Sequence, residues 1–252
     1  MTFFALIICC ANTTQAMDSV NKGARAVNVL LSAALVAEIN PNFEFRKQQS
    51  IDTLNIVKGY GYENPYVVEA LRKKGPTFLE TYCSQDHICY AQLNDPSLKN
   101  PGLNEPVTLW EAAHQFNFPA ESLVLKLTGR YQPTSPYLFE LAEKNEGNYD
   151  AYVKVCKKNE IKQKGFARPE EVLTLAYVMR AKFFLDMNRS VREQIKSLDD
   201  QGLTGESAVT SYIKAMEQEG SMKVHYLDKL DVRANLRGSS TAPGAQEEIV
   251  DF

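Results

Sequence analysis

Residue types that usually reveal catalysis or cofactor binding are scarce in this 252-residue chain. It holds three histidines, one tryptophan and five cysteines, and no two cysteines have the CxxC spacing of a zinc site. Glycine-rich phosphate and dinucleotide motifs, EF-hand loops and the GxSxG elbow are also missing. The formal charge of −3 gives no global attraction to nucleic acid or to an anionic membrane. These absences favour a protein that has no metal, no cofactor and no catalytic site.

The chain begins with a short apolar run, Phe3–Ala11, that has the length of the hydrophobic region of a signal peptide. It is too short to span a bilayer, which takes about 20 apolar residues. Thr14-Gln15-Ala16 offers a cleavage site with small residues, so the pattern predicts a signal peptide over 1–16 and a secreted or periplasmic protein. No basic residue precedes the run, and a buried first helix is the alternative.

A second apolar stretch, Val27–Ile39, has the length of a buried core helix. Polar residues separate it from the first run. An alternative is that residues 1–39 act together as a membrane anchor or a membrane-penetrating segment.

The cysteines suggest an oxidising compartment. Cys83 and Cys89 are six residues apart and predict a local disulfide in an exported protein. Cys156 is then the odd thiol. His87 lies between the pair, but no fourth ligand is visible nearby, so zinc is not predicted.

The chain predicts helices almost throughout, because no segment shows sustained period-two alternation between hairpin turns. Prolines and acidic residues mark helix starts, glycines mark helix ends, and Thr204 is placed to cap a late helix. The predicted fold is an all-α, irregular bundle of roughly ten short-to-medium helices. Its predicted members include Val27–Ile39, Ser50–Lys58, Pro65–Lys74, Thr77–Tyr90, Pro106–Gln115, Pro119–Thr128, Ser135–Gly147, Pro169–Met187 and a helix capped by Ser190.

The stretch 94–106 contains three prolines and no hydrophobic periodicity, which is typical of a linker or long loop. We therefore expect two possible helical subdomains, 17–93 and 107–237. The small and polar segment 238–252 is expected to be a disordered tail.

The stretch Thr108–Leu127 resembles a helix-turn-helix, with Asn117 suited to the left-handed turn. Its second helix offers only one basic residue, Lys126, and Arg130 just beyond it could add a phosphate contact. A recognition helix needs several side chains aimed at base edges. Two packed helices are therefore favoured, and nucleic acid is not an expected partner.

The overlapping stretch Leu109–Pro133 resembles the opening of a lysozyme-like lytic transglycosylase, where an alanine-rich helix leads through a proline to the catalytic helix. This resemblance implies a cell-wall glycan hydrolase. At the position of that family's glutamate and serine, this chain has Thr128-Gly129. Glu111 and Glu121 are the nearest carboxylates, and neither takes over the catalytic role.

Three tyrosines, Tyr60, Tyr62 and Tyr66, cluster in the segment KGYGYENPY. Tyrosine supplies rigid amphipathic contact area and is enriched at interfaces. We therefore expect these rings to bind another macromolecule, most simply another protein. The sequence predicts an exported helical protein that acts by binding, with the glycan hydrolase and the membrane-associated protein as alternatives.

Overall fold

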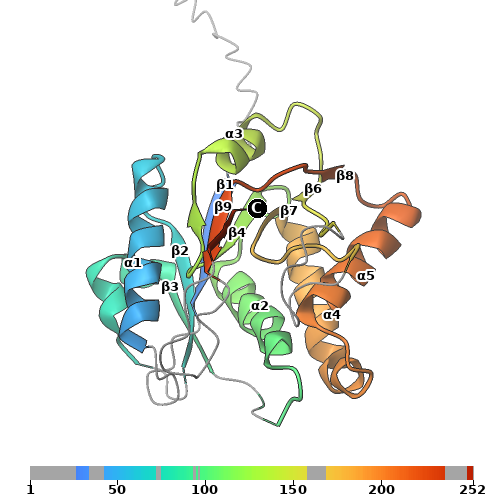
Figure 1. Ribbon diagram of the computed structural model, residues 1–252, viewed down its shortest axis with the longest axis horizontal. Coiled ribbons are helices and arrows are strands. Elements are labelled where there is room, and N and C mark those ends of the chain that lie inside the picture. The colour runs from blue at the N-terminus through green and yellow to red at the C-terminus, as the bar shows by residue number, and fades with distance from the viewer. Residues whose placement is uncertain are drawn as a thin grey trace, which may run out of the picture.

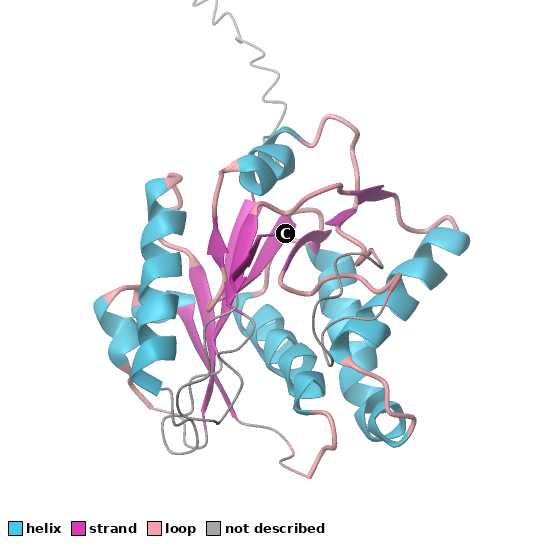
Figure 2. Ribbon diagram, viewed as in Figure 1, coloured by secondary structure: helices cyan, strands magenta, loops and turns pink. Residues whose placement is uncertain are grey.

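The structure, a computed structural model, shows an α/β protein built around a seven-stranded sheet (Figures 1 and 2). The predicted signal peptide at 1–16 lies outside the described residues, and secretion or periplasmic location stays a prediction. The described residues are 27–33, 43–71, 75–92, 95, 97–157, 169–235 and 249–251.

The main sheet has the strand order β3-β2-β1-β4-β7-β6-β8. Strands β1 to β4 run parallel, with β1 between β2 and β4. Strand β7 is antiparallel to both of its neighbours, and β8 is parallel to β6. The strands are β1 Val27–Ala33, β2 Tyr66–Leu71, β3 Ile88–Gln92, β4 Leu123–Thr128, β6 Ala151–Val153, β7 Ala176–Arg180 and β8 Val224–Tyr226.

A second, three-stranded antiparallel sheet has the order β10-β9-β5. Its strands are β5 Gln132–Pro133, β9 Val232–Asn235 and β10 Ile249–Asp251. Strand β10 belongs to the stretch expected to be a disordered tail, and it pairs with β9 instead.

In the part of the chain that the structure describes, five α-helices pack on the two faces of the main sheet (Figure 1). Helices α1 and α3 contribute to the core cluster on one face, and α2, α4 and α5 contribute to the cluster on the other. The helices are α1 Phe43–Gly59, α2 Asn104–Phe116, α3 Tyr137–Lys144, α4 Ala181–Asp200 and α5 Gly205–Gln218, with short 3-10 turns at Phe78–Thr81, Gln85–His87 and Pro101–Leu103.

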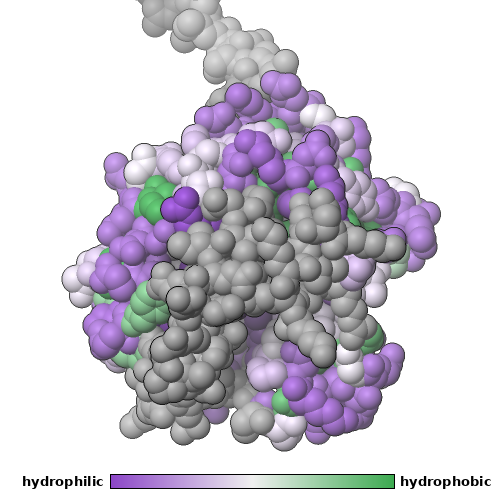
Figure 3. Space-filling view, in the orientation of Figure 1, coloured by the Kyte–Doolittle hydropathy of each residue, from purple (hydrophilic) through white to green (hydrophobic). Residues whose placement is uncertain are grey.

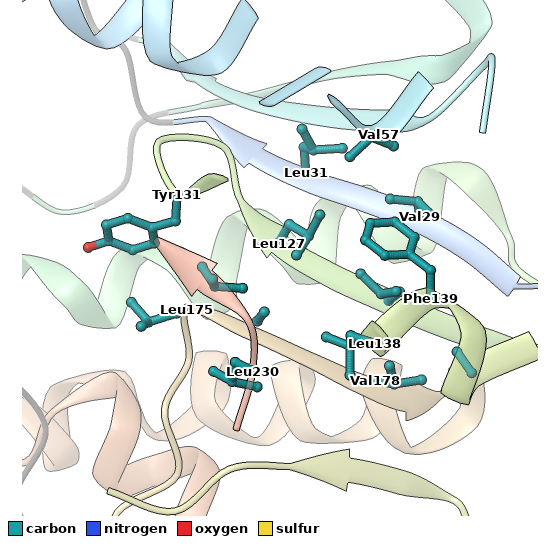
Figure 4. Close-up of a cluster of buried hydrophobic side chains, with 14 of the residues drawn as sticks. Val29, Leu31, Val57, Leu127, Tyr131, Leu138, Phe139, Leu175, Val178 and Leu230 are labelled. Carbon is teal, nitrogen blue, oxygen red and sulfur yellow. The ribbon is translucent and has the colours of Figure 1, made fainter. Parts of the chain in front are cut away.

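The core consists of two large clusters because successive strand residues point to opposite faces of the sheet. In β1, Val29 and Leu31 face the α1/α3 side, whereas Leu30 faces the α2/α4/α5 side. Figure 4 shows the first cluster, where Leu138 and Phe139 of α3 lie over the strands. On the face drawn in Figure 3, the described side chains at the surface are mostly hydrophilic.

The prediction of an all-α fold is wrong, because several predicted helices are buried strands. Strand β4 occupies the predicted helix Pro119–Thr128, and β2 occupies Pro65–Lys74. Five of the six residues of β4 are buried. A parallel strand covered on both faces has a continuous apolar run without alternation, which resembles a short buried helix.

The segments Val27–Ile39 and Thr77–Tyr90 were misassigned in the same way. The first contains β1, and the second contains two 3-10 turns followed by the start of β3. Within the described ranges, no helix is long and apolar enough to cross a membrane.

The predicted helix Pro169–Met187 divides into β7 and the start of α4. Ser190 lies inside α4 and does not cap a new helix. Thr204 does cap α5, where its hydroxyl accepts a hydrogen bond from the Ser207 amide at 3.0 Å. That part of the prediction is confirmed.

The predicted disulfide between Cys83 and Cys89 is wrong, since both are buried thiols outside any disulfide. Cys83 belongs to the core cluster on the α1/α3 face, whereas Cys89 points from β3 into the cluster on the opposite face. The sheet therefore separates the two sulfur atoms, and a bond between them would require the strand to turn over. Cys156 is also a buried thiol outside any disulfide.

This separation predicts the redox state of the purified protein. Peptides containing Cys83 and Cys89 should be alkylated to the same extent with and without prior reduction, once the protein is denatured. Mass spectrometry of the labelled peptides measures this directly. If either cysteine is labelled only after reduction, the result contradicts the structure.

Candidate functional site

The most distinctive polar residues of the protein lie where the parallel strands β1 and β4 end. The chain leaves β1 through α1 on one face of the sheet, and it reaches β4 through α2 on the other face. The strand order therefore reverses between β1 and β4. Open α/β sheets bind ligands outside the carboxyl ends of their strands at such a switch point.

Lys126 of β4 is fully buried, which is rare for a lysine. Its Nζ donates to the Thr128 hydroxyl at 2.8 Å and to the Thr174 carbonyl at 2.6 Å. It also forms an ion pair with Glu105 Oε1 at 2.8 Å. The ammonium lies 5.7 Å from the Tyr177 ring centroid, within cation–π distance. Each polar contact offsets part of the cost of burying the charge.

Glu105 links this lysine to β1. Its Oε1 also accepts hydrogen bonds from Ser32 Oγ at 2.5 Å and from Thr128 Oγ1 at 3.3 Å. Burial alone would raise the pKa of Glu105, but Lys126, the Ser32 hydroxyl and the charge of Arg130 together lower it below its ordinary value. Glu105 is therefore an ionised carboxylate at neutral pH.

Helix α2 presents Glu105 at this edge because the helix begins at Asn104. A carboxylate in the first turn is favoured by the helix dipole, and Pro106 suits the same turn because it needs no backbone donor there. The helix ends at Asn117, whose φ of 48° is left-handed, as the sequence predicts.

Gly129 brings the end of β4 against β1 and α1. Its amide donates to the Ser32 carbonyl at 2.8 Å. A Cβ at this position would lie 3.2 Å from the Ser32 carbonyl oxygen and 3.4 Å from Ser50 Oγ, so a larger residue would require these neighbours to shift by a few tenths of an ångström. Glycine therefore permits the close approach that delivers Arg130 to α1.

Two arginines approach each other beside Tyr131. Arg46 in the first turn of α1 is only 8% exposed, and burial, followed by the charge of Arg130, lowers the pKa of Arg46 to about 10. The Arg130 guanidinium carbon lies 4.8 Å from the Tyr131 ring centroid. Arg130 Nε is buried without a hydrogen-bond partner among the described residues. The charge of Arg130 acts on Arg46 as a repulsion, and it acts on the Glu105 carboxylate as an attraction.

Glu69 near the end of β2 is a second buried acid at the same edge. It is 2% exposed, and the Thr77 hydroxyl donates to its Oε2 at 2.7 Å. Burial raises the pKa of Glu69 to about 7, and the Thr77 hydrogen bond offsets this only in part. Within the described residues, no group of three or more His, Cys, Asp or Glu side chains could hold a metal ion.

The tyrosines proposed from the sequence do not share one surface. Tyr60 and Tyr62 pack on Phe139 of α3, with ring centroids 5.2 and 5.3 Å away. Tyr66 instead stacks on His87 at 4.2 Å, at the start of β2. Their role in binding a protein stays a prediction.

Glu111 and Glu121, the carboxylates considered for the transglycosylase resemblance, do not lie at the ends of β1 and β4. Glu121 precedes β4 and pairs with Arg180 at 3.0 Å and with Lys182 at 3.1 Å, at the end of the sheet opposite Thr128. Glu111 lies two turns into α2. Sequence reasoning considered Lys126 and Arg130 only as part of a helix-turn-helix, and it did not identify Ser32, Arg46, Glu69 and Glu105 at all. The sequence did contain a signal for this site: Lys126 lies inside an otherwise apolar run, and Gly129-Arg130 follows that run.

The Lys126–Glu105 pair predicts a clear pattern of stability. Glu105→Gln removes the charge that faces the fully buried ammonium and should cost about 3 kcal/mol of unfolding free energy. Adding Lys126→Met should restore most of that loss, because an apolar side chain of similar length needs no partner. Urea denaturation of the wild type, both single variants and the double variant measures the cycle. Additive losses would show that the two charges do not interact.

Glu69 predicts a pH dependence of stability. Its folded pKa of about 7 lies above the ordinary value of 4.5, so the unfolded chain ionises first as the pH rises. The folded state should therefore lose about 3 kcal/mol between roughly pH 4.5 and pH 7, and no more above that. Glu69→Gln should remove this loss.

The comparison is made by denaturation at pH 4.5 and pH 8. The stability of Glu69→Gln relative to wild type should rise by about 3 kcal/mol between these values. Glu63→Gln, on an exposed turn, is the matched control for removing one carboxyl. A difference between Glu69→Gln and wild type that is equal at both pH values would rule out a buried, protonated Glu69.

Comparison with known proteins supports the α/β fold. No family model matches the chain, and no curated protein matches its sequence. Among solved structures, it is similar to 4-diphosphocytidyl-2C-methyl-D-erythritol synthase from Anaerococcus prevotii DSM 20548, with 16% identity and a TM-score of 0.51 over 81% of this chain and 87% of that one. The inositol-1-phosphate CTP transferase from T. maritima matches with 12% identity and a TM-score of 0.46, over 81% and 86% of the two chains.

The likeness to the synthase is one of fold, and it overturns the function predicted from the sequence. The helical binding protein is wrong, because the chain has an α/β fold similar to that of the synthase; export stays a prediction. The lysozyme-like alternative fails because its catalytic helix is β4. The membrane alternative fails over Val27–Ala33, which is the buried strand β1; residues 1–26 and 34–39 lie outside the described residues.

Proposed function

We propose that the protein is a transferase that binds a nucleotide-activated donor at the carboxyl ends of β1 and β4. The observation that carries this proposal is the pair of guanidiniums, Arg46 and Arg130, brought together beside Tyr131. Arginine binds phosphate through parallel N–H donors, and a diphosphate would neutralise the two charges.

The fold supports the choice of ligand. The pair lies at the topological switch point, where open α/β sheets bind nucleotides. The similar synthase from Anaerococcus prevotii is named for a diphosphocytidyl product, so that fold handles a nucleotide joined through a diphosphate. The same class of donor fits a site that presents two arginines.

The sequence after β1 narrows the class of donor. No glycine occurs from residue 24 to residue 58, the region that leads from β1 into α1. Glycine-rich loops hold triphosphates by backbone N–H groups, and this chain offers side chains instead. A nucleoside diphosphate joined to the group transferred is therefore favoured over a nucleoside triphosphate.

The arginines also have a role in the reaction itself. An acceptor hydroxyl forms the new bond as the bond between the transferred group and the diphosphate breaks. The diphosphate leaves with the electron pair, and the hydroxyl proton passes to water. Arg46 and Arg130 lie where they would stabilise the negative charge that develops on the departing diphosphate.

Binding of nucleotides tests this proposal. Isothermal titration with UDP, CDP, GDP and ADP should show micromolar or tighter binding for at least one of them, and much weaker binding of the corresponding nucleoside. Arg130→Gln should weaken that binding about 10- to 100-fold, because a charged hydrogen bond contributes about 1.5–3 kcal/mol.

The same variant should change the stability of the ligand-free protein little, because it removes both the repulsion by Arg46 and the attraction to Glu105. Arg189→Gln, which removes an exposed guanidinium paired with Asp186 on α4, is the control and should leave binding unchanged. Failure of all four diphosphates to bind the wild type, or tighter binding of the triphosphates, would overturn the proposed donor.

A further inference from the structure

Glu105 has one oxygen committed to the protein and one available to a ligand. Oε1 accepts from Ser32, Thr128 and Lys126. Oε2 has no hydrogen-bond donor among the described residues, and 29% of the side chain is exposed. The carboxylate therefore presents a single free acceptor at the edge between β1 and β4.

The protein fixes the direction of that acceptor. Three donors hold Oε1 from two strands, Ser32 on β1 and Lys126 and Thr128 on β4. The lysine cannot move toward solvent, because it is fully buried and also donates to the Thr174 carbonyl. Such preorganisation lowers the entropy lost when a ligand binds.

The charges around Glu105 restrict what Oε2 can bind. Phosphate is repelled by the carboxylate, and a cationic ligand gains little because Lys126 and Arg130 already compensate the charge of that carboxylate. A neutral O–H donor has neither disadvantage. A ligand that fits must therefore carry hydroxyl groups next to its phosphates, since the acceptor and the guanidinium pair lie at the ends of the same two strands.

We propose that Oε2 of Glu105 accepts a hydrogen bond from a sugar hydroxyl of the donor, and that this contact selects donors with a free hydroxyl beside the diphosphate. The inference rests on the proposed function, because it names a group on the same ligand. Two sources share this chemistry: the ribose of the nucleoside and a sugar joined to the diphosphate.

The first experiment varies the ligand and leaves the protein intact. The nucleoside diphosphate that binds best is compared with its 2′-deoxy and 3′-deoxy forms, and its glucose conjugate is compared with the 2-deoxyglucose conjugate. Loss of the hydroxyl that Glu105 contacts should weaken binding about 10- to 100-fold. A loss in the first pair identifies the ribose, and a loss in the second identifies the transferred sugar.

The second experiment tests whether Glu105 is the residue that distinguishes the hydroxyl ligands from the deoxy ligands. The double variant Glu105→Met/Lys126→Met is used, because it leaves no unpaired buried charge and no side-chain acceptor at position 105. Its ratio of affinities for the hydroxyl and deoxy ligands should fall to about 1, whereas a general weakening of binding would leave the ratio unchanged. Glu111→Gln removes a carboxyl from the same helix and should keep the wild-type ratio.

The outcomes separate this inference from the proposed function. If nucleoside diphosphates bind but no deoxy ligand is discriminated, or if the double variant discriminates as well as the wild type, Glu105 does not read a hydroxyl and the inference is wrong. If no nucleoside diphosphate binds the wild type, the proposed function itself is wrong.

Discussion

The buried ion pair between Lys126 and Glu105 is the constraint on which the rest of the site depends. A lysine without solvent exposure is costly unless its charge is compensated, and here a carboxylate, a hydroxyl and a carbonyl surround it. These partners come from α2, β4 and the segment before β7. Satisfying one ammonium therefore fixes the relative positions of three elements, and Ser32 adds β1 through the same carboxylate.

The ion pair also shapes the electrostatics of the strand ends. Its two charges compensate each other, and Arg46 and Arg130 place two further positive charges at this edge of a protein with a formal charge of −3. Local charge of this kind concentrates anions regardless of the net charge. The global composition excluded a general affinity for nucleic acid, and it gave no information about a site made by two converging arginines.

Sequence patterns predicted several helices well and missed the sheet. The helix from Pro106, the helix from Ser135 and the cap at Thr204 correspond to α2, α3 and α5, because caps, prolines and three-to-four spacing are local signals. Strands β4 and β7 carry almost uninterrupted buried residues, since helices or the second sheet cover both faces. Without alternation, nothing local distinguishes them from buried helices, and length is the better criterion.

The site was harder to predict than the fold because its members are distant in sequence. Ser32, Arg46, Glu105 and Arg130 meet only when β1 and β4 become neighbours, and that pairing was invisible while β4 was taken for a helix. One residue did carry a local signal. Lys126 interrupts the run LVLKLT, and a charge at such a position has to find a buried partner or destroy the strand. Reading the run as a central strand would have required a carboxylate nearby, and Glu105, which opens the preceding helix, is the residue that meets this requirement.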